Sequence, residues 1–209
     1  MSGRYGPLLL LTVLAVPARG ADDDFVSLIK GTDLAQFELL GLDKDSMKIR
    51  DGEVWLDGKH KGYFATKASY KNYVLEFEWM FERPEKYKDG DRFDGNSGVL
   101  LHIQGKHQVW PKGIEIQVWH KHQYGDFYTH GGAKFSPKKD EHARLEKVLK
   151  PVGQWNRHEI TCRDGTITLK VNGTEIAHGV KADPDQGAIG WMNEDRPVRF
   201  RNLKIKKLD

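Results

Sequence analysis

Apolar and polar residues alternate along nearly the whole of residues 21–209, and this pattern constrains the fold more than any other feature. In residues 73–81, every second position is apolar, and glutamates occupy two of the positions between. A period of two is typical of a half-buried strand. The one helix candidate, residues 140–149, is short and polar, ends before Pro151 and could equally be a loop. The sequence therefore predicts an all-β protein.

Turn signals indicate that the strands are antiparallel. Asp-Gly at 164–165 and Asn-Gly at 172–173 both tolerate the positive φ of a type I′ turn. Between them, residues 166–171 alternate strictly, which predicts a strand with one buried and one solvated face. In residues 198–208 the alternation slips at Asn202, which predicts a β-bulge. We expect a two-sheet sandwich built from such antiparallel strands.

The first twenty residues have the pattern of a secretory signal. Arg4 precedes an apolar run over 8–16, and Ala18 and Gly20 are small residues of the kind found at a cleavage site. The run is too short to span a bilayer, which needs about 20 apolar residues, and no later segment is a candidate for a span. We expect a secreted or periplasmic protein, cleaved near Gly20, with residues 21–209 as a single domain.

Charge and cysteine content narrow the possible partners and chemistry. The formal net charge of +3 falls to +1 once Arg4 and Arg19 are removed, so there is no general attraction for nucleic acid. The chain has one cysteine and thus no internal disulfide. Cys162 alternates inward with Ile160, which indicates a buried thiol rather than a nucleophile.

Two predicted strands, residues 96–104 and 113–119, each have an apolar side and an unusual polar side. The polar positions are Asn96, His102 and Gln104 on the first strand, and Glu115, Gln117 and Trp119 on the second. Carboxylates and amides bind sugar hydroxyls, and an indole ring covers the apolar faces of sugars. The alternative is an ordinary solvated sheet face. The concentration of Asn, Gln, His and Trp favours a carbohydrate site, and we expect one cleft on the concave sheet lined by Asn96, His102, Glu115, Gln117 and Trp119.

Histidines gather in the same part of the chain. They are His102, His107, His120, His122 and His130. Although His120 and His122 have a spacing that could hold zinc, no ligand motif such as His-Glu-x-x-His is present. We therefore predict histidines that contact sugar or lie in polar loops, with no catalytic metal or other cofactor; a structural calcium ion remains possible.

Seven segments in one order carry a family resemblance that spans nearly the whole of residues 21–209. They are residues 25–34, Asn96-Ser97-Gly98-Val99, Gly113-Ile114-Glu115-Ile116-Gln117-Val118, Gln154-Trp155-Asn156, Val171-Asn172-Gly173, Gly187-Ala188-Ile189-Gly190 and Val198-Arg199-Phe200-Arg201-Asn202-Leu203. The chain resembles the 3-keto-disaccharide hydrolase domain family. The resemblance implies a concanavalin A-like jelly roll and an exported bacterial protein that acts on oxidised glycosides. His102 and His120 stand where family members often have an arginine and an acid.

The resemblance implies chemistry at C2 and C1 of a 3-keto sugar, either direct hydrolysis or elimination followed by hydration. We expect Glu115 as base or acid, assisted by His102; the residues expected to bind substrate are Asn96, Gln104, Gln117, Trp119 and His120. His120 or Asp126 is the alternative base. The two-carboxylate glycosidase mechanism is disfavoured, because residues 115–120 lack the Glu-x-Asp-x-x-Glu pattern of jelly-roll retaining enzymes. The alternative function is a non-catalytic lectin or laminin G-like carbohydrate-binding module.

Overall fold

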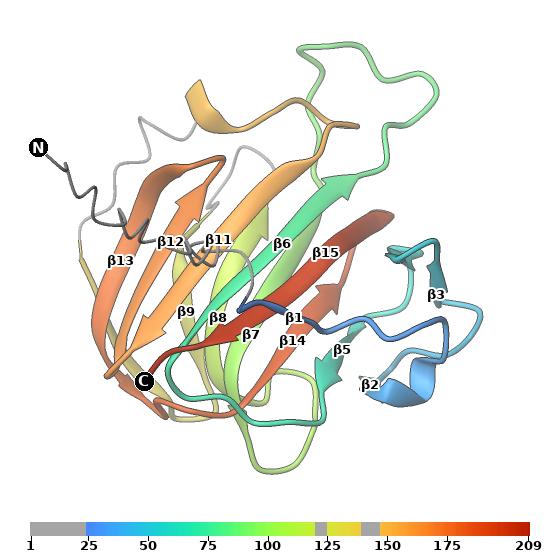
Figure 1. Ribbon diagram of the computed structural model, residues 1–209. Helices are drawn as coiled ribbons and strands as arrows, with labels where there is room; N and C mark the ends of the chain where they lie inside the picture. The colour runs from blue at the N-terminus through green and yellow to red at the C-terminus, as the bar shows by residue number, and fades with distance from the viewer. Residues whose placement is uncertain (1–23, 120–124, 139–146) are drawn as a thin grey trace, which may run out of the picture.

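Two antiparallel sheets face each other in the computed structural model, which describes residues 24–119, 125–138 and 147–209 (Figure 1). In order across the nine-stranded sheet, the strands are β10 (Lys134–Pro137), β13 (Thr174–Asp183), β12 (Thr166–Val171), β11 (Asn156–Arg163), β6 (Tyr73–Phe81), β15 (Val198–Lys207), β4 (Glu53–Leu56) and β3 (Met47–Arg50), with β1 (Val26–Ser27) also paired to β15. The six-stranded sheet has the order β2 (Phe37–Leu40), β5 (Gly62–Thr66), β14 (Ala188–Asn193), β7 (Asn96–Gln104), β8 (Lys112–Trp119) and β9 (Phe127–His130). The prediction of an all-β, two-sheet jelly-roll sandwich is confirmed.

The core lies between the two sheets and follows the sequence alternation. On β12, Ile167, Leu169 and Val171 are fully buried in the main cluster, while the residues between them are half-buried. Ile160 and Cys162 join the same cluster, as predicted from their spacing. Burial raises the pKa of Cys162 to about 12, so the thiol stays protonated and unreactive.

The predicted turns and the predicted bulge are present. Asp164 and Gly165 have φ values of 48° and 73°, as the tight turn between β11 and β12 requires. The pairing of β15 with β6 changes register between Arg201 and Lys204, and Asn202 in this bulge has a φ of 53°. The Asn202 amide donates to Glu78 Oε2 (2.7 Å), which secures the irregular backbone on the outer face of the sheet.

Little regular helix accompanies the sheets in the described residues. The 3₁₀ turn η1 (Leu34–Gln36) begins at Asp33, whose carboxylate accepts a hydrogen bond from the Ala35 amide (2.8 Å). Most of the helix candidate at 140–149 and the whole expected signal segment at 1–20 lie outside the described residues. Within the described ranges, we find no helix of the length and apolarity that crossing a bilayer demands.

Candidate functional site

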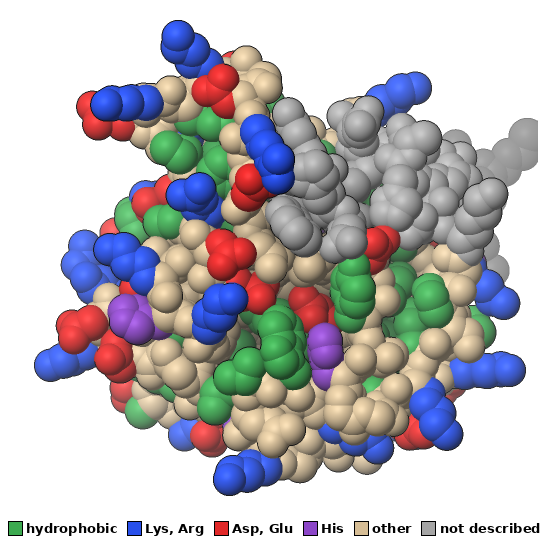
Figure 2. All heavy atoms as spheres, turned by 180° about the vertical axis from the view of Figure 1, so that it is seen from behind, with side chains coloured by type: hydrophobic (Ala, Val, Ile, Leu, Met, Phe, Trp, Pro, Cys, Tyr) green, Lys and Arg blue, Asp and Glu red, His purple; other side chains and the backbone are tan. Residues whose placement is uncertain are grey.

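The outer face of the six-stranded sheet, seen in Figure 2, gathers acidic and histidine side chains among apolar ones near its middle. Strand register explains the gathering. The β7–β8 pairing sets Leu100 opposite Glu115 and Gly98 opposite Gln117. The β8–β9 pairing sets Tyr128 on the other side of Glu115. Residues opposite each other in an antiparallel pair share a face, so Glu115 and Gln117 both lie on this outer face.

Glu115 is only 3% exposed and has a defined partner on each carboxylate oxygen. Oε2 lies 2.7 Å from Nε2 of His130 on β9. In the amide orientation that suits its surroundings, the Gln117 nitrogen donates to Glu115 Oε1 and to the Ser97 carbonyl, both at 2.9 Å. The contact is a hydrogen bond to the carboxylate when His130 carries a proton on Nε2, and in that neutral tautomer Nδ1 has the lone pair.

A second buried carboxyl group, Glu194, follows the end of β14. Glu194 is 6% exposed, and its Oε2 has no hydrogen-bond partner among the described residues. Burial raises its pKa to about 7, with further contributions from the charges of Glu115 and Asp195, and Lys61 opposes the rise. A carboxyl group with this pKa can hold a proton at neutral pH and release it during a reaction.

Gly98 on β7 makes room for the buried carboxylate. A Cβ atom at this position would lie 2.5 Å from Glu115 Oε1 and 2.8 Å from the sulfur of Met192 on β14. Both contacts are shorter than van der Waals separation allows. The absence of a side chain at Gly98 therefore lets Glu115 lie flat against the sheet and reach His130.

The loop of residues 105–111, between β7 and β8, contacts both sides of this face. His107 Nδ1 lies 2.9 Å from the Tyr63 hydroxyl on β5. The Trp110 ring lies 5.1 Å from the His130 ring at an angle of 31°. Trp110 has a φ of 59°, which is unusual for a bulky residue and costs on the order of 1–3 kcal/mol. The loop thus forms one rim of the Glu115 site, by which we mean Glu115, Gln117, His130 and Glu194.

Comparison with known proteins identifies the family. The sequence matches the 3-keto-alpha-glucoside-1,2-lyase-like domain over residues 24–206. The chain belongs to this family. No curated protein gives a significant match.

Solved structures similar to this family member share its fold at low identity. A candidate glycosyl hydrolase from Parabacteroides distasonis has a TM-score of 0.64 and 20% identity, covering 90% of this chain and 95% of its own. A second candidate glycosyl hydrolase from the same organism has a TM-score of 0.62 and 19% identity, with 89% and 100% covered. The carbohydrate-binding module CBM66 from Bacillus subtilis has a TM-score of 0.54 and 11% identity, with 88% and 96% covered. These similarities establish the jelly-roll fold.

Two of the predicted site residues do not share the Glu115 face. The β7–β8 register shifts between Leu101 and Gln104, where His102 adopts a φ of 58°. This bulge reverses the alternation, so Ile103 joins Leu100 in the outer cluster and His102 turns inward against the ring of Tyr73. The predicted placement of His102 and Gln104 beside Glu115 is therefore wrong.

His102 is suited to a structural role where it lies. It is 1% exposed, and Nδ1 donates to the Pro184 carbonyl (3.0 Å). Burial lowers its pKa to about 4, so the ring is neutral at ordinary pH. Gln104 donates its amide to the Gln186 carbonyl instead of pointing toward the Glu115 site.

The remaining predicted residues have different outcomes. Asn96 is half-buried and pairs with Trp119 at the ends of β7 and β8, two residues from the Gly98–Gln117 pair. Gln117 is buried, and its amide holds Glu115, which favours positioning over sugar contact. His120 and His122 lie outside the described residues. In the described part of the chain, no three or more His, Cys, Asp or Glu side chains are grouped to hold a metal ion.

The sequence indicated no role for Glu194, Tyr63 or Trp110, and it placed His130 only among the histidines of one region. His130 belongs to the histidine-rich region, but only the β8–β9 register shows that it reaches Glu115. Glu194 is about eighty positions from Glu115 in the sequence, and no local pattern connects them. Trp110 lies in a loop, where alternation carries no information on side-chain direction.

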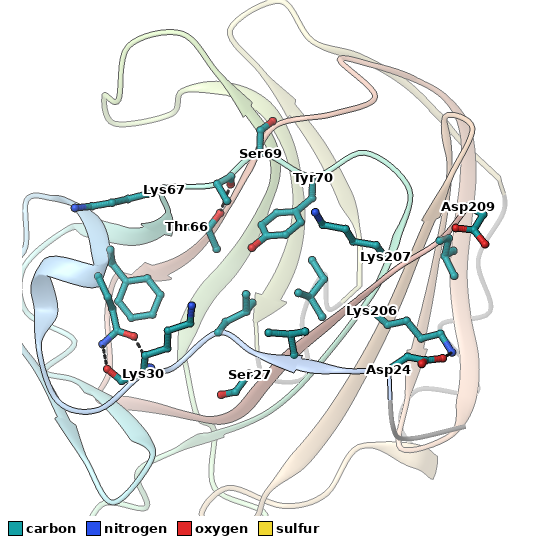
Figure 3. A pocket seen from close by; sticks show the side chains of 17 residues that line it. Asp24, Ser27, Lys30, Thr66, Lys67, Ser69, Tyr70, Lys206, Lys207 and Asp209 are labelled. Atoms are coloured by element: carbon teal, nitrogen blue, oxygen red, sulfur yellow. Dashed lines mark hydrogen bonds and ion pairs between the residues drawn. The ribbon is translucent and has the colours of Figure 1, made fainter. Parts of the chain in front are cut away.

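A separate hollow of about 980 Å³ lies between β1, η1 and the end of β15 (Figure 3). Its lining includes Lys30, Lys67 and Tyr70, and Lys206 pairs there with Asp24 (2.9 Å). No member of the Glu115 site lines this hollow. The hollow and the Glu115 site are therefore separate features of the molecule.

Proposed function

We propose that this protein cleaves the glycosidic bond of 3-keto-glycosides at the Glu115 site. The observation that carries the proposal is the buried Glu115 carboxylate, which orients a partly exposed His130 imidazole through a 2.7 Å contact. Family membership supports the substrate class, because the matching family is described as 3-keto-alpha-glucoside-1,2-lyase-like. Proton abstraction next to a carbonyl needs a base positioned within reach of that proton, which is the role that an oriented imidazole can fill.

His130 acts as the base in this scheme, with Glu115 as its orienting partner. Since Nε2 donates to Glu115, Nδ1 is the atom that accepts the C2 proton of the substrate. The C2–H electron pair forms a C1=C2 double bond while the C1–O bond breaks. The carboxylate then stabilises the imidazolium that has formed. Addition of water across the double bond gives the free 3-keto sugar, so elimination plus hydration amounts to hydrolysis.

Glu194 supplies the proton that the leaving oxygen needs. Its pKa of about 7 keeps a proton available at neutral pH. The nearby Glu115 carboxylate contributes to that pKa, so the two carboxyl groups divide the roles of charge and proton donor. This division differs from our sequence-based prediction, in which Glu115 was assisted by His102.

The decisive experiment is turnover of methyl 3-keto-glucoside in D₂O, followed by NMR. Elimination removes the C2 hydrogen, so the hydrated product carries deuterium at C2. Release of methanol with full retention of the C2 hydrogen would contradict the scheme. His130→Gln should reduce kcat by about a hundredfold or more. His102→Asn is the control: asparagine tolerates a positive φ, and activity at pH 7 should be retained.

A second candidate function is non-catalytic carbohydrate binding. The exposed aromatic ring of Trp110 beside polar groups favours it, because such a surface suits a sugar without requiring catalysis. A binding module would show sugar affinity, no turnover of any 3-keto-glycoside and no change in affinity on Glu115→Gln.

We also propose export, which N-terminal sequencing of the protein from culture medium or periplasm would test: the mature chain should begin near Ala21.

A further inference from the structure

Trp110 combines features that a merely structural tryptophan lacks. Its side chain is 42% exposed, although tryptophan is a residue that proteins normally cover. Its backbone is held at a φ of 59°, a conformation that bulky residues rarely adopt. Unusual backbone conformations of this kind cluster at ligand-binding positions, because the surrounding structure must hold them in place.

The ring of Trp110 is placed against the proposed base. Its centroid lies 5.1 Å from that of His130, and the two planes are inclined by only 31°. Trp110 therefore covers one side of the imidazole, and the exposed part of the indole continues the surface outward from the Glu115 site. A group bonded to the reacting sugar would meet this surface as soon as it leaves the buried polar centre.

We propose that Trp110 is a stacking platform for a ring-shaped leaving group, either a second sugar or an aromatic aglycone. This inference rests on the proposed function. In that scheme His130 takes the proton from C2, and the scissile bond is on the adjacent carbon C1, so the leaving group begins one bond from the base. In the same scheme the keto ring lies over the centre, which the buried groups Glu115, Gln117 and Glu194 occupy. The exposed indole at the rim remains for the part of the substrate beyond C1.

The substrate class follows from this placement. A planar indole face covers the apolar C–H face of a pyranose or stacks on an aryl ring. A methyl aglycone is too small to cover the ring. We therefore expect 3-keto-disaccharides and aryl 3-keto-glucosides to be better substrates than methyl 3-keto-glucoside, and the difference to depend on Trp110.

The test compares Trp110→Gly with Val109→Ala on three substrates: 3-keto-trehalose, phenyl 3-keto-glucoside and methyl 3-keto-glucoside. Glycine suits the positive φ, so the variant removes the ring without straining the loop. Val109 is the adjacent exposed apolar residue, 57% exposed, and serves as the matched control. For Trp110→Gly, kcat/KM should fall about three- to tenfold on the disaccharide and the phenyl glucoside, mostly through KM. On the methyl glucoside, kcat/KM of Trp110→Gly should change by less than about twofold. Val109→Ala should change kcat/KM by less than about twofold on all three substrates.

Two results would overturn the platform. Equal losses on all three substrates would place Trp110 under the keto ring, and no loss on any would leave it without a ligand role. Failure of the proposed function is recognised separately, because the wild-type protein would then turn over none of the three. In that case calorimetric binding of phenyl glucoside decides: weaker binding by Trp110→Gly supports the platform, and equal binding or none rejects it.

Discussion

The two outer faces of the sandwich both carry nearly buried glutamates, but the side chains that pair with these carboxylates differ. On the nine-stranded sheet, Glu76 is 6% exposed and pairs with Arg157 (2.7 Å) and Lys204 (3.1 Å). On the six-stranded sheet, Glu115 is 3% exposed and its partners are the His130 ring and the Gln117 amide, with no arginine or lysine among them. Arginine and lysine stay protonated at physiological pH, whereas histidine titrates there.

The aromatic side chains of the two faces differ in the same way. On the nine-stranded sheet, Arg199 covers the Trp55 ring at 3.2 Å from its centroid, and Arg201 covers the Trp155 ring at 4.0 Å. Arg201 also pairs with Glu78 of β6, and Arg199 pairs with Glu82, the residue after β6. On the six-stranded face, Trp110 lies against the His130 imidazole and keeps part of its ring exposed. The two tryptophan rings of the nine-stranded face are thus covered by cations of the same face, whereas no cation–π contact covers Trp110 among the described residues.

A buried charge alone does not mark a catalytic site. A carboxylate held by permanent cations is fixed in one protonation state, and its role is structural. Glu194 on the other face has instead no hydrogen-bond partner for Oε2 among the described residues, and burial raises its pKa to about 7, so it can exchange a proton near neutral pH. The proposed chemistry uses this difference between the two faces.

Removing one carboxylate charge from each face is the sharpest test of whether the two faces differ in function. Glu115→Gln keeps the shape of the side chain but can no longer stabilise an imidazolium at His130. Its kcat on a 3-keto-glycoside should fall by about 10²–10⁴, equivalent to about 3–5 kcal/mol of transition-state stabilisation. Glu76→Gln is the matched control and should leave kcat unchanged while lowering the free energy of unfolding. Comparable losses of kcat in both variants would mean that the two faces are not functionally distinct.

The free energy of unfolding should depend on pH through Glu194. Burial, together with the charge of Glu115, raises the pKa of Glu194 from 4.5 to about 7. The folded protein thus holds a proton that the unfolded chain has lost, so this stabilising contribution is complete below about pH 4.5 and disappears as pH rises through about 7. A shift of this size corresponds to at most about 3 kcal/mol. In urea unfolding at pH 4.5 to 8, Glu194→Gln should be free of that decline.

For Glu78 on the nine-stranded face, we expect the pH dependence of stability to have the opposite sign. Burial acts to raise the pKa of Glu78, but hydrogen bonds from Arg201 and Asn202 outweigh it and hold the pKa below its usual value. Its contribution to stability is therefore present above the unfolded pKa and lost as pH falls through the folded one. Glu78→Gln should reduce the loss of stability on acidification. Slopes of the same sign for Glu78 and Glu194 would contradict the assigned environments.

The sequence predicted the regular strands of this molecule and missed irregular positions that leave the apolar pattern unbroken. Strict alternation on β12 and the Asp-Gly turn before it specify local conformation directly, so both were predictable. The bulge in β15 was predictable because Asn202 breaks the alternation visibly. The bulge at His102 was not, because apolar residues flank it on both sides and the pattern reads as continuous through it.

The candidate site was predictable only as far as two neighbouring strands. Alternation assigned Asn96, Glu115 and Gln117 to one face because β7 and β8 are adjacent in both sequence and space. Glu194 directly follows β14, a strand that is far from β7 in the sequence but pairs with it in the sheet. A single sequence carries no signal for such long-range pairing. The proton donor of the proposed reaction therefore needed the structure.

A smaller effect is expected from filling the space above Gly98. In Gly98→Ala, the new methyl group would meet Glu115 Oε1 at 2.5 Å and the Met192 sulfur at 2.8 Å, so both side chains must move. Displacement of Glu115 from His130 should lower kcat about tenfold, and overpacking should cost about 1–3 kcal/mol of stability. Met192→Ala added to this variant should recover stability more than activity. Full activity in Gly98→Ala would show that the contact between Glu115 and His130 is not needed for catalysis.

The smallest effect is expected from a single cation on the nine-stranded face. Arg201 Nε lies 2.8 Å from Glu78 Oε2, and both side chains are partly exposed, so solvent screens the pair. A double-mutant cycle of Arg201→Gln and Glu78→Gln should give a coupling of about 1 kcal/mol or less, weaker at high salt. Loss of the contact with Trp155 adds about 0.5–1 kcal/mol to the single arginine variant. Activity on a 3-keto-glycoside should stay within about twofold of the wild-type value, because this face holds its charges only for stability. A larger loss of activity would show that the permanent ion pairs of the nine-stranded sheet influence the Glu115 site through the core.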